Sequence, residues 1–240
     1  MRAVELLQAV RYEPAGEKIR FPDREISGVS IDSRDCREGS VFVCIRGSVC
    51  NGSRYAKEAV RHGAKVLVAA KEEQELIGKI LGQFPECEGV LVEDEREAAA
   101  LLAARYEGEP SRSMMMIGVT GTKGKTTTVS MIRKILSEAG IRTGMIGTTG
   151  QFDGKEHLPS EHTTPDAVTL QRSLARMRKN ACRACVMEVS SQALKLQRTK
   201  GICFDTGVFL NLGDDHIGRF EHADKEEYLA CKRKLFLQSR

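Results

Sequence analysis

The sequence predicts an α/β protein with mostly parallel sheets, in which two regions follow each other along the chain. Short apolar runs alternate with helical patterns along most of the 240 residues, and this alternation is typical of parallel sheets covered by helices. A glycine-rich segment stands between an apolar strand and a helix, which is the setting of a phosphate-binding loop. No apolar stretch reaches the roughly 18 residues of a membrane span, so none is expected.

The composition narrows the classes of function. Hydrophobic residues make up 41% and charged residues 29% of the chain, as in soluble globular proteins. The net charge of +4 is spread over interspersed acids and bases, whereas nucleic-acid binding normally shows a clustered basic face; we expect no nucleic-acid partner. The first residues lack a signal peptide's apolar segment, which predicts a cytoplasmic protein. Cys182 and Cys185 form a lone Cys-x-x-Cys pair without the further ligands that a zinc site needs.

Residues 1–110 read as one α/β unit. Its opening helix is expected over Val4, Leu6, Leu7 and Val10. Strands are expected at residues 26–32, 39–46, 65–70 and 89–92. Helices are expected at residues 55–63, 71–83 and 95–106, and residues 108–111 read as a linker.

Residues 111–240 continue with strand–loop–helix repetition. Strands are expected at residues 113–120, 142–146, 184–189 and 204–210, with a hairpin at 152–156. Helices are expected at residues 125–139, from Pro165 toward Asn180, and at 224–238.

The phosphate-loop signal follows the strand that ends at residue 120. It consists of the consecutive residues Gly121, Thr122, Lys123, Gly124, Lys125, Thr126 and Thr127. Glycines let the backbone wrap closely around phosphate, and the N–H groups of a helix N-terminus supply positive potential. Lys125 can reach the outer phosphates, and the Thr126 hydroxyl can ligate Mg²⁺. The segment therefore predicts binding of ATP and Mg²⁺, although Val119 stands where the general phosphate-loop pattern has glycine.

Three further residues are candidates for the same site. Glu188 ends one expected strand and His216 follows another, and ligands of open α/β sheets gather at the carboxyl ends of strands. A carboxylate there suits Mg²⁺, which prefers oxygen ligands. From the residues alone, a helix-capping acid at 188, a structural histidine at 216 and a surface lysine at 232 remain open.

These segments resemble the Mur ligase family. The resemblance lies in Gly-Thr-x-Gly-Lys-Thr-Thr, in Met-Glu-Val-Ser-Ser-Gln around Glu188, in Asp-His at His216, and in Tyr-x-x-x-Lys ending at Lys232. It implies that Lys125 and Thr126 contact the β/γ-phosphates and magnesium, with Thr127 in support. It also implies that Glu188 and His216 hold magnesium and that Lys232, carbamylated by CO₂, becomes another ligand. After His216 the chain departs from the family's usual Tyr-His-Gly run.

The substrate side resembles the UDP-N-acetylmuramoyl-tripeptide synthetase branch of that family. The resemblance rests on the Asp-Ser-Arg segment at Ser33, on Gly-Ser-Val-Phe-Val at 39–43 and on the His-Thr-Thr-Pro segment at Thr163 and Thr164. It implies that Ser33 and the loop beginning at Ser48 hold the uridine diphosphate. It implies contacts from Thr163, Thr164 and Ser190 to the muramoyl peptide. Arg198 resembles an arginine that contacts the acidic end of the substrate, as a guanidinium suits a carboxylate.

The resemblance implies a domain order and a reaction. Residues 1–110 would be the UDP-muramoyl-binding domain and 111–240 an incomplete ATP-binding central domain; the family's third domain would be absent and the isolated chain inactive or nearly so. The implied enzyme is an ATP-dependent ligase of peptidoglycan precursor synthesis. It adds a free amino acid, of lysine or diaminopimelate type, to UDP-N-acetylmuramoyl-L-alanyl-D-glutamate through an acyl phosphate. Another phosphate-loop ATPase or kinase, or a non-catalytic nucleotide-sugar-binding module, remains an alternative.

Overall fold

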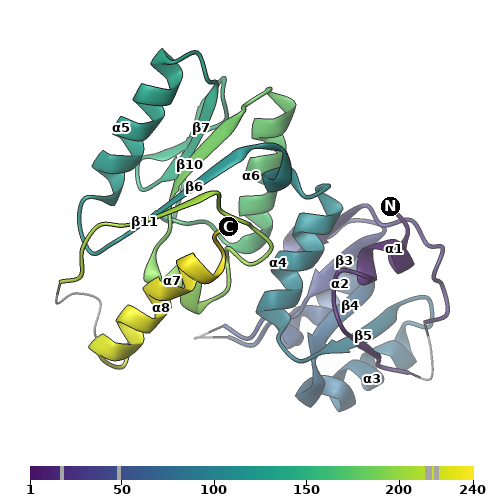
Figure 1. Cartoon of the computed structure of the whole chain (residues 1–240). Helices are drawn as coiled ribbons and strands as arrows, with labels where there is room; N and C mark the ends of the chain where they lie inside the picture. Colours follow the sequence, from purple (N-terminus) through teal and green to yellow (C-terminus); the bar gives the residue numbers. More distant parts are fainter. Residues whose placement is uncertain (17–18, 48–49, 214–217, 219–221) are drawn as a thin grey trace. The chain divides into compact units, whose positions relative to one another are not determined.

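The computed structural model describes the chain from Met1 to Arg240 except residues 17–18, 48–49, 214–217 and 219–221. The chain divides into two compact units, Met1–Tyr106 and Glu107–Arg240 (Figure 1). Each unit contains a mostly parallel sheet with helices packed on it, which confirms the predicted α/β class. Among the described residues, no helix is both long and apolar enough to cross a membrane.

The sheet of the first unit has the order β1-β5-β4-β3-β2 in the described part of the chain. β2 to β5 are parallel, and β1 pairs antiparallel with β5. The strands are β1 Glu13–Pro14, β2 Gly28–Ser30, β3 Ser40–Val43, β4 Ala64–Ala70 and β5 Glu88–Val92. The helices are α1 Ala3–Leu7, α2 Ala56–Arg61, α3 Gln74–Gln83 and α4 Glu95–Tyr106, with short 3₁₀ turns at Ser33–Asp35, Gly52–Tyr55 and Lys71–Glu73.

Burial explains why these strands form. Every residue of β3 and β5 is buried, as expected for central parallel strands covered on both faces. Phe42 and Leu67 pack with Ile77 of α3 in one apolar cluster. The helix expected at 55–63 is shorter, because Gly63 adopts φ +107° and its Cβ would lie 2.4 Å from the Glu38 nitrogen. Only glycine fits there, and it ends the helix.

The sheet of the second unit has the order β11-β6-β10-β7-β8-β9 within the described residues. The first four strands of this order are parallel, and β7-β8-β9 is antiparallel. The strands are β6 Met115–Thr120, β7 Thr143–Gly147, β8 Gly150–Phe152, β9 His157–Leu158, β10 Ala184–Glu188 and β11 Thr206–Phe209. The helices are α5 Lys125–Glu138, α6 Ala167–Lys179, α7 Ser191–Lys195 and α8 Lys225–Leu237, with a 3₁₀ turn at Pro110–Ser113.

Local signals account for most boundaries of the second unit. The predicted hairpin is confirmed, since β8 pairs with β9 across a turn that Asp153 closes by accepting two backbone N–H groups. The helix expected from Pro165 begins two residues later, because Asp166 is its N-cap and accepts hydrogen bonds from Val168 and Thr169. α7 was not predicted; it is only five residues long, too short to show a helical period.

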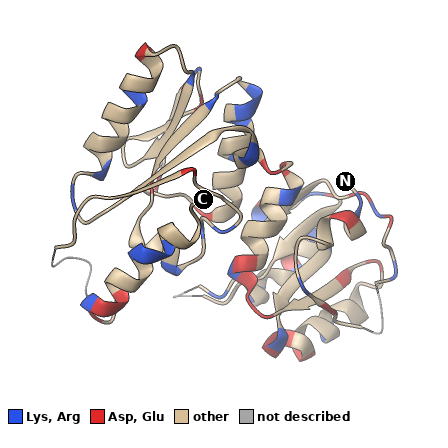
Figure 2. Ribbon diagram, viewed as in Figure 1, with Lys and Arg blue, Asp and Glu red and all other residues tan. Residues whose placement is uncertain are grey.

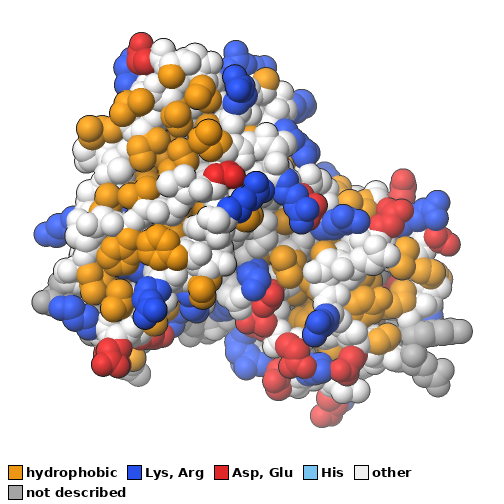
Figure 3. Space-filling view, viewed as in Figure 1, with side chains coloured by type: hydrophobic (Ala, Val, Ile, Leu, Met, Phe, Trp, Pro, Cys, Tyr) orange, Lys and Arg blue, Asp and Glu red, His pale blue; other side chains and the backbone are white. Residues whose placement is uncertain are grey.

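Charged and apolar side chains are distributed differently over the surface. Acidic and basic residues occur together on both units (Figure 2). Hydrophobic side chains gather on one face of the second unit, over α5 and β11 (Figure 3). Met131 and Ile135, both of α5, are 60% and 63% exposed.

Candidate functional site

Three strands of the second unit bring their carboxyl ends to one edge of the sheet. β6 and β10 are parallel, with Val119 opposite Glu188, and β11 runs alongside β6 with Phe209 opposite Thr120. The segments that follow these strands therefore meet at one edge, the place where open α/β sheets bind ligands. The segments are the phosphate loop, residues 189–191 and residues 210–213.

The glycines of the phosphate loop are required by its conformation. Gly121 and Gly124 have φ of +153° and +87°, values that residues with a Cβ rarely adopt. Gly121 is also packed closely, since an added Cβ would lie 3.0 Å from the Leu210 Cβ. Gly124 is the N-cap of α5, so the loop leads directly into a helix N-terminus whose first N–H groups have no partner within the helix. This geometry suits an anion such as phosphate.

Asn211 and Tyr228 hold the loop in place. The sequence analysis assigned neither a role, although Tyr228 begins the Tyr-x-x-x-Lys segment. The Asn211 side chain accepts hydrogen bonds from the Thr122 and Lys123 nitrogens at 3.2 and 3.0 Å, and donates to the Lys123 carbonyl at 3.1 Å. The Thr122 hydroxyl lies 3.1 Å from the Tyr228 hydroxyl and accepts from the Gly213 nitrogen at 2.8 Å. The loop is thus fixed from two other segments before any ligand arrives.

Two predicted lysines meet at this loop. Lys125 Nζ donates to the carbonyl oxygens of Gly121 and Thr122 at 2.9 and 3.1 Å. Lys232 Nζ donates to the same Gly121 oxygen at 2.9 Å and lies 4.3 Å from the centre of the Tyr228 ring. Lys232 is only 1% exposed, so the surface-lysine alternative is wrong. Two cationic groups beside a phosphate-type loop make a strongly anion-attracting position.

Glu188 is buried at the end of β10, with 1% of its surface exposed. Its Oε1 accepts a hydrogen bond from the Thr148 nitrogen at 2.9 Å, and its Oε2 accepts from the Thr148 hydroxyl at 3.4 Å. Gly147 leaves room for this carboxylate, because an added Cβ would lie 2.4 Å from Glu188 Oε1. A carboxylate has about four acceptor positions, so these contacts leave capacity for a cation.

The residues assigned to the muramoyl peptide form one hydrogen-bonded group. Thr164 Oγ1 donates to the Glu188 carbonyl at 2.9 Å and accepts from the Ser190 nitrogen at 3.1 Å. Ser190 caps α7, and Arg198 donates to the Thr164 carbonyl at 2.8 Å. The Thr163 hydroxyl lies 3.0 Å from that of Thr148, so this group is linked directly to the surroundings of Glu188.

A cavity of about 250 Å³ is lined both by the two lysines of the phosphate-loop region and by the residues assigned to the muramoyl peptide. Its volume is close to the lower end of the range for small-molecule sites, roughly 300 to 1,000 Å³. Predicted residues on its wall are Lys125, Thr163, Thr164, Ser190, Arg198 and Lys232. The remaining lining residues are Glu161, His162, Ser191, Gln192 and His222. The structure therefore brings six predicted site residues, which the sequence spreads over more than a hundred positions, to one polar cavity.

Other predicted residues lie elsewhere or outside the described part. Ser33 belongs to the first unit, where its hydroxyl donates to Glu58 Oε2 at 3.1 Å. Ser48 and His216 lie outside the described residues. Thr126 and Thr127 belong to the first turn of α5, half-buried and exposed respectively. The roles of all these residues stay predictions.

The Cys182 and Cys185 pair is consistent with a structural role. Both thiols are buried, and burial raises the pKa of each above its ordinary value. A raised pKa keeps a thiol protonated, and the protonated form is a poor nucleophile and metal ligand.

Comparison with known proteins places the chain in a family. The description "Mur ligase middle domain" matches residues 119–240, and "Mur ligase family, catalytic domain" matches residues 25–107. The chain belongs to the Mur ligase family. This confirms the resemblance drawn from the phosphate loop and from the segments around Glu188 and Lys232.

Individual relatives narrow the comparison. A UDP-N-acetylmuramoyl-L-alanyl-D-glutamate--2,6-diaminopimelate ligase of Clostridium botulinum is 38% identical over 218 residues, covering 91% of this chain and 44% of the relative. A solved structure of a ligase with that name has a TM-score of 0.78 and 25% identity, covering the whole chain and 46% of its own. A MurF ligase of Thermotoga maritima in complex with ADP shares the fold, with a TM-score of 0.53 and 23% identity over 88% of this chain and 43% of its own. The chain thus spans less than half the length of these relatives.

Proposed function

We propose that this chain supplies the nucleotide-binding and substrate-binding units of an ATP-dependent ligase of peptidoglycan precursor synthesis. The ligase would join an amino acid to UDP-N-acetylmuramoyl-L-alanyl-D-glutamate. The names of the relatives favour diaminopimelate as that amino acid over lysine. The observation that carries the proposal is the convergence of Lys125 and Lys232 on the Gly121 carbonyl, at one cavity with Thr163, Thr164, Ser190 and Arg198.

The two units divide the work in this proposal. Residues 1–110 bind the UDP-muramoyl substrate, with Ser33 and Ser48 at the uridine diphosphate. Residues 111–240 bind ATP through the backbone of Gly121, Thr122, Lys123 and Gly124 and through the side chains of Lys125, Thr126 and Thr127. A loop already braced by Asn211 and Tyr228 supports this assignment, because a preformed loop loses little conformational freedom on binding.

The residues of the site fit Mg²⁺ by their chemistry. Hard oxygen ligands suit this ion, and the Glu188 carboxylate and Thr126 hydroxyl are of that kind; His216 and a carbamylated Lys232 complete the proposed set. When bound, Mg²⁺ would offset negative charge on the phosphates. Carbamylation of Lys232 would require its side chain to move, because Nζ donates a hydrogen bond to the Gly121 oxygen in this structure. A carbamate is an anion and an acceptor there, so the side chain must turn away from that carbonyl.

The chain's own residues act by holding charge and position. Lys125 moves its ammonium group from the loop carbonyls toward the γ-phosphate. The muramoyl peptide is oriented by Thr163, Thr164 and Ser190. Arg198 pairs with a carboxylate at the acidic end of the substrate, because a guanidinium group can bind a carboxylate through two hydrogen bonds. The peptide's terminal carboxylate attacks the γ-phosphorus to give an acyl phosphate and ADP, and the amine of the amino acid then displaces phosphate. Positioning and electrostatic stabilisation are sufficient for such a transfer, so no protein nucleophile is needed.

The substitution Lys125→Ala tests the nucleotide-binding step. We expect ATP affinity of the 240-residue chain to fall at least about tenfold, because a charge-assisted phosphate contact is worth roughly 1.5–3 kcal/mol. Lys134→Ala is the matched control: Lys134 is on the same helix, 75% exposed and paired with Glu138. Isothermal titration with ATP and Mg²⁺ measures both variants. Equal affinity in the wild type and Lys125→Ala would remove Lys125 from the site.

The substrate assignment needs a separate measurement. Binding of UDP-N-acetylmuramoyl-L-alanyl-D-glutamate to the chain is expected to weaken in Arg198→Ala, while ATP binding persists. Phosphate release from ATP alone, undiminished when the muramoyl peptide is omitted, would instead favour the ATPase alternative. Binding of the UDP-muramoyl substrate without any ATP binding would favour the non-catalytic module.

A further inference from the structure

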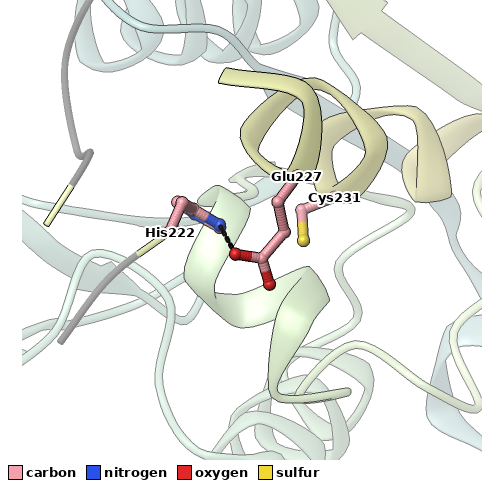
Figure 4. Close-up of side chains that lie close together, drawn as sticks. All are labelled: His222, Glu227 and Cys231. Atoms are coloured by element: carbon pink, nitrogen blue, oxygen red, sulfur yellow. Dashed lines mark ion pairs between the residues drawn. The ribbon is translucent and has the colours of Figure 1, made fainter. Parts of the chain in front are cut away.

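A cluster of three potential metal ligands lies beside the cavity that Lys125 and Lys232 line. It consists of His222, Glu227 and Cys231, whose side chains point toward one another (Figure 4). One ring nitrogen, one carboxylate oxygen and the sulfur all lie within 4.8 Å of each other. Glu227 and Cys231 are four residues apart on α8 and thus share a face of the helix, while His222 precedes the N-cap Asp224. We propose that this cluster binds a thiophilic divalent cation, best matched by Zn²⁺.

The donor types select the class of ion. Imidazole, carboxylate and thiolate together are typical ligands of Zn²⁺, whereas Mg²⁺ takes oxygen ligands almost alone. Three protein ligands leave one position of a tetrahedral zinc ion for water or another group. The cluster is therefore different in kind from the proposed Mg²⁺ set at Glu188 and Thr126, and it does not rest on the proposed ligase function.

The histidine is already oriented for such a role. His222 is 1% exposed, and its Nε2 lies 2.9 Å from the Ser191 hydroxyl. That contact turns Nδ1 toward Glu227, with 3.9 Å between Nδ1 and Oε2. The ring also packs on Tyr228, with 5.1 Å between ring centres. Metal-binding histidines commonly have their second nitrogen held in this way by a hydrogen-bonding group.

Glu227 also has a structural role, because its backbone and side chain hold the start of α8. It helps to cap the start of α8: its nitrogen donates to the side chain of the N-cap Asp224 at 2.8 Å, and its Oε2 accepts from the Ala223 nitrogen at 2.7 Å. Its Oε1 pairs with Lys195 at 2.7 Å. The hydrogen bond from Lys195 holds the pKa of Glu227 below its ordinary value, so the carboxylate is charged and keeps acceptor positions for a cation.

These capping contacts of Glu227 do not require the other two residues of the cluster. A helix start needs neither an imidazole nor a thiol, yet both are nearly fully buried against this one carboxylate; Cys231 is 3% exposed. Because successive residues of a helix point about 100° apart, Cys231 faces the cluster while its neighbour Lys232 faces the phosphate loop. An ion at the cluster would cross-link the start of α8 to the preceding segment, behind the cavity wall that His222 and Lys232 share.

Binding is balanced by the loss of one proton. The Cys231 thiol is protonated at neutral pH, since burial raises its pKa. The sulfur–proton bond breaks as the sulfur–metal bond forms, and the proton passes to solvent. No oxidation or reduction is involved.

Cobalt provides the direct test, because a thiolate–Co²⁺ bond gives a charge-transfer band in the near ultraviolet. The reduced 240-residue chain is titrated with Co²⁺ in excess Mg²⁺, and then with Zn²⁺. We expect one equivalent of Co²⁺ to produce the band and Zn²⁺ to abolish it. Cys231→Ser should remove the band, and His222→Gln should lower the affinity at least about tenfold. Cys203→Ser, which removes a partly exposed thiol of the same unit, should titrate like the wild type.

The contradicting outcomes are equally direct. No band in the wild type, or an unchanged band in folded Cys231→Ser, would overturn the proposal. X-ray absorption of the zinc-loaded wild-type chain covers the case in which the variants do not fold. One sulfur at about 2.3 Å together with nitrogen or oxygen neighbours is expected. A shell without sulfur would exclude the site.

Discussion

Two buried carboxylates, one in each unit, lie at opposite ends of their parallel strands. Glu88 begins β5 in the first unit and Glu188 ends β10 in the second; they are 3% and 1% exposed. Glu88 Oε1 accepts hydrogen bonds from the backbone nitrogens of Arg20 and Phe21. Glu188 accepts from Thr148 beside the phosphate loop. The first acid holds a loop of its own unit, and the second lies where three strand ends meet.

The difference between Glu88 and Glu188 lies in what surrounds each carboxylate at its end of the strand. Burying a carboxylate is costly unless hydrogen bonds or a cation offset the lost hydration. At the amino end of β5, two backbone N–H groups serve that purpose. At the carboxyl end of β10, the Thr148 nitrogen and hydroxyl donate to the carboxylate, and the proposed Mg²⁺ would supply positive charge. Ligands of open α/β sheets bind beside the carboxyl ends of the strands, so the same residue type is a structural acceptor at Glu88 and a proposed metal ligand at Glu188.

The substitution Glu188→Gln should have the largest effect on ligand binding. We expect the gain in ATP affinity that Mg²⁺ provides to shrink at least about tenfold, because one charged ligand of the ion is lost. Glutamine still offers an oxygen to the Thr148 nitrogen, so the fold should persist. Calorimetric titrations with ATP, with and without Mg²⁺, measure the gain. An unchanged gain would mean that Glu188 does not hold the ion.

The substitution Glu88→Ala should act on stability alone. The backbone donors of Arg20 and Phe21 lose their acceptor, and a hydrogen bond to a charged group contributes about 1.5–3 kcal/mol. We expect the free energy of unfolding to fall by about 2 kcal/mol in denaturant titrations, with Mg²⁺-dependent ATP affinity as in the wild type. If ATP affinity fell as much as in Glu188→Gln, the contrast between the two ends would be wrong.

The fold was predictable because its signals are local. Buried strands such as β4 show as apolar runs, and α4 was predicted with its observed bounds, Glu95–Tyr106. Two of the missed elements are short: β1 has two residues and α7 has five. A period of 3.6 or 2 needs several repeats before it stands out from chance.

The site was predictable only where one segment carries the chemistry. Gly121 and Lys125 lie within one short motif. Asn211 was not found, because it acts through contacts with Thr122 and Lys123 some 88 residues earlier in the chain. Tyr228 appeared only as part of a family motif, and its contact with the Thr122 hydroxyl spans 106 residues. Side chains that hold a loop from a distant part of the sequence form no motif with that loop, so the sequence alone does not reveal them.

The cluster of His222, Glu227 and Cys231 was missed for a different reason. Its residues are close in sequence, but zinc patterns are usually recognised as pairs of cysteines or histidines. Here the candidate donors, one nitrogen, one oxygen and one sulfur, come from the segment before α8 and from the first two turns of that helix. A cluster of mixed donors at such spacings can be recognised only from a structure that shows both the helix and the preceding turn.

A third buried acid gives the smallest predicted effect and extends the comparison to pH. Asp153, in the β8–β9 turn, is 5% exposed and accepts from the Lys155 and Glu156 nitrogens at 2.9 Å each. Burial alone would raise its pKa, but these backbone donors and Arg176 outweigh burial and hold the pKa below the ordinary 3.8. A carboxylate with a lowered folded pKa stabilises the protein above its unfolded pKa, and this contribution is lost as pH falls through the folded pKa.

Asp153→Asn keeps an oxygen acceptor in the turn but removes the charge. At neutral pH we expect the variant to be less stable by about 1 kcal/mol, the usual difference between charged and neutral hydrogen bonds. The gap should narrow below pH 3.8, where the wild-type carboxylate begins to be protonated. Denaturant titrations of both proteins at stepped pH measure this gap, and the other carboxylates cancel in the difference. A gap that stays constant as the pH falls would show that the shape of the side chain, and not its charge, stabilises the turn.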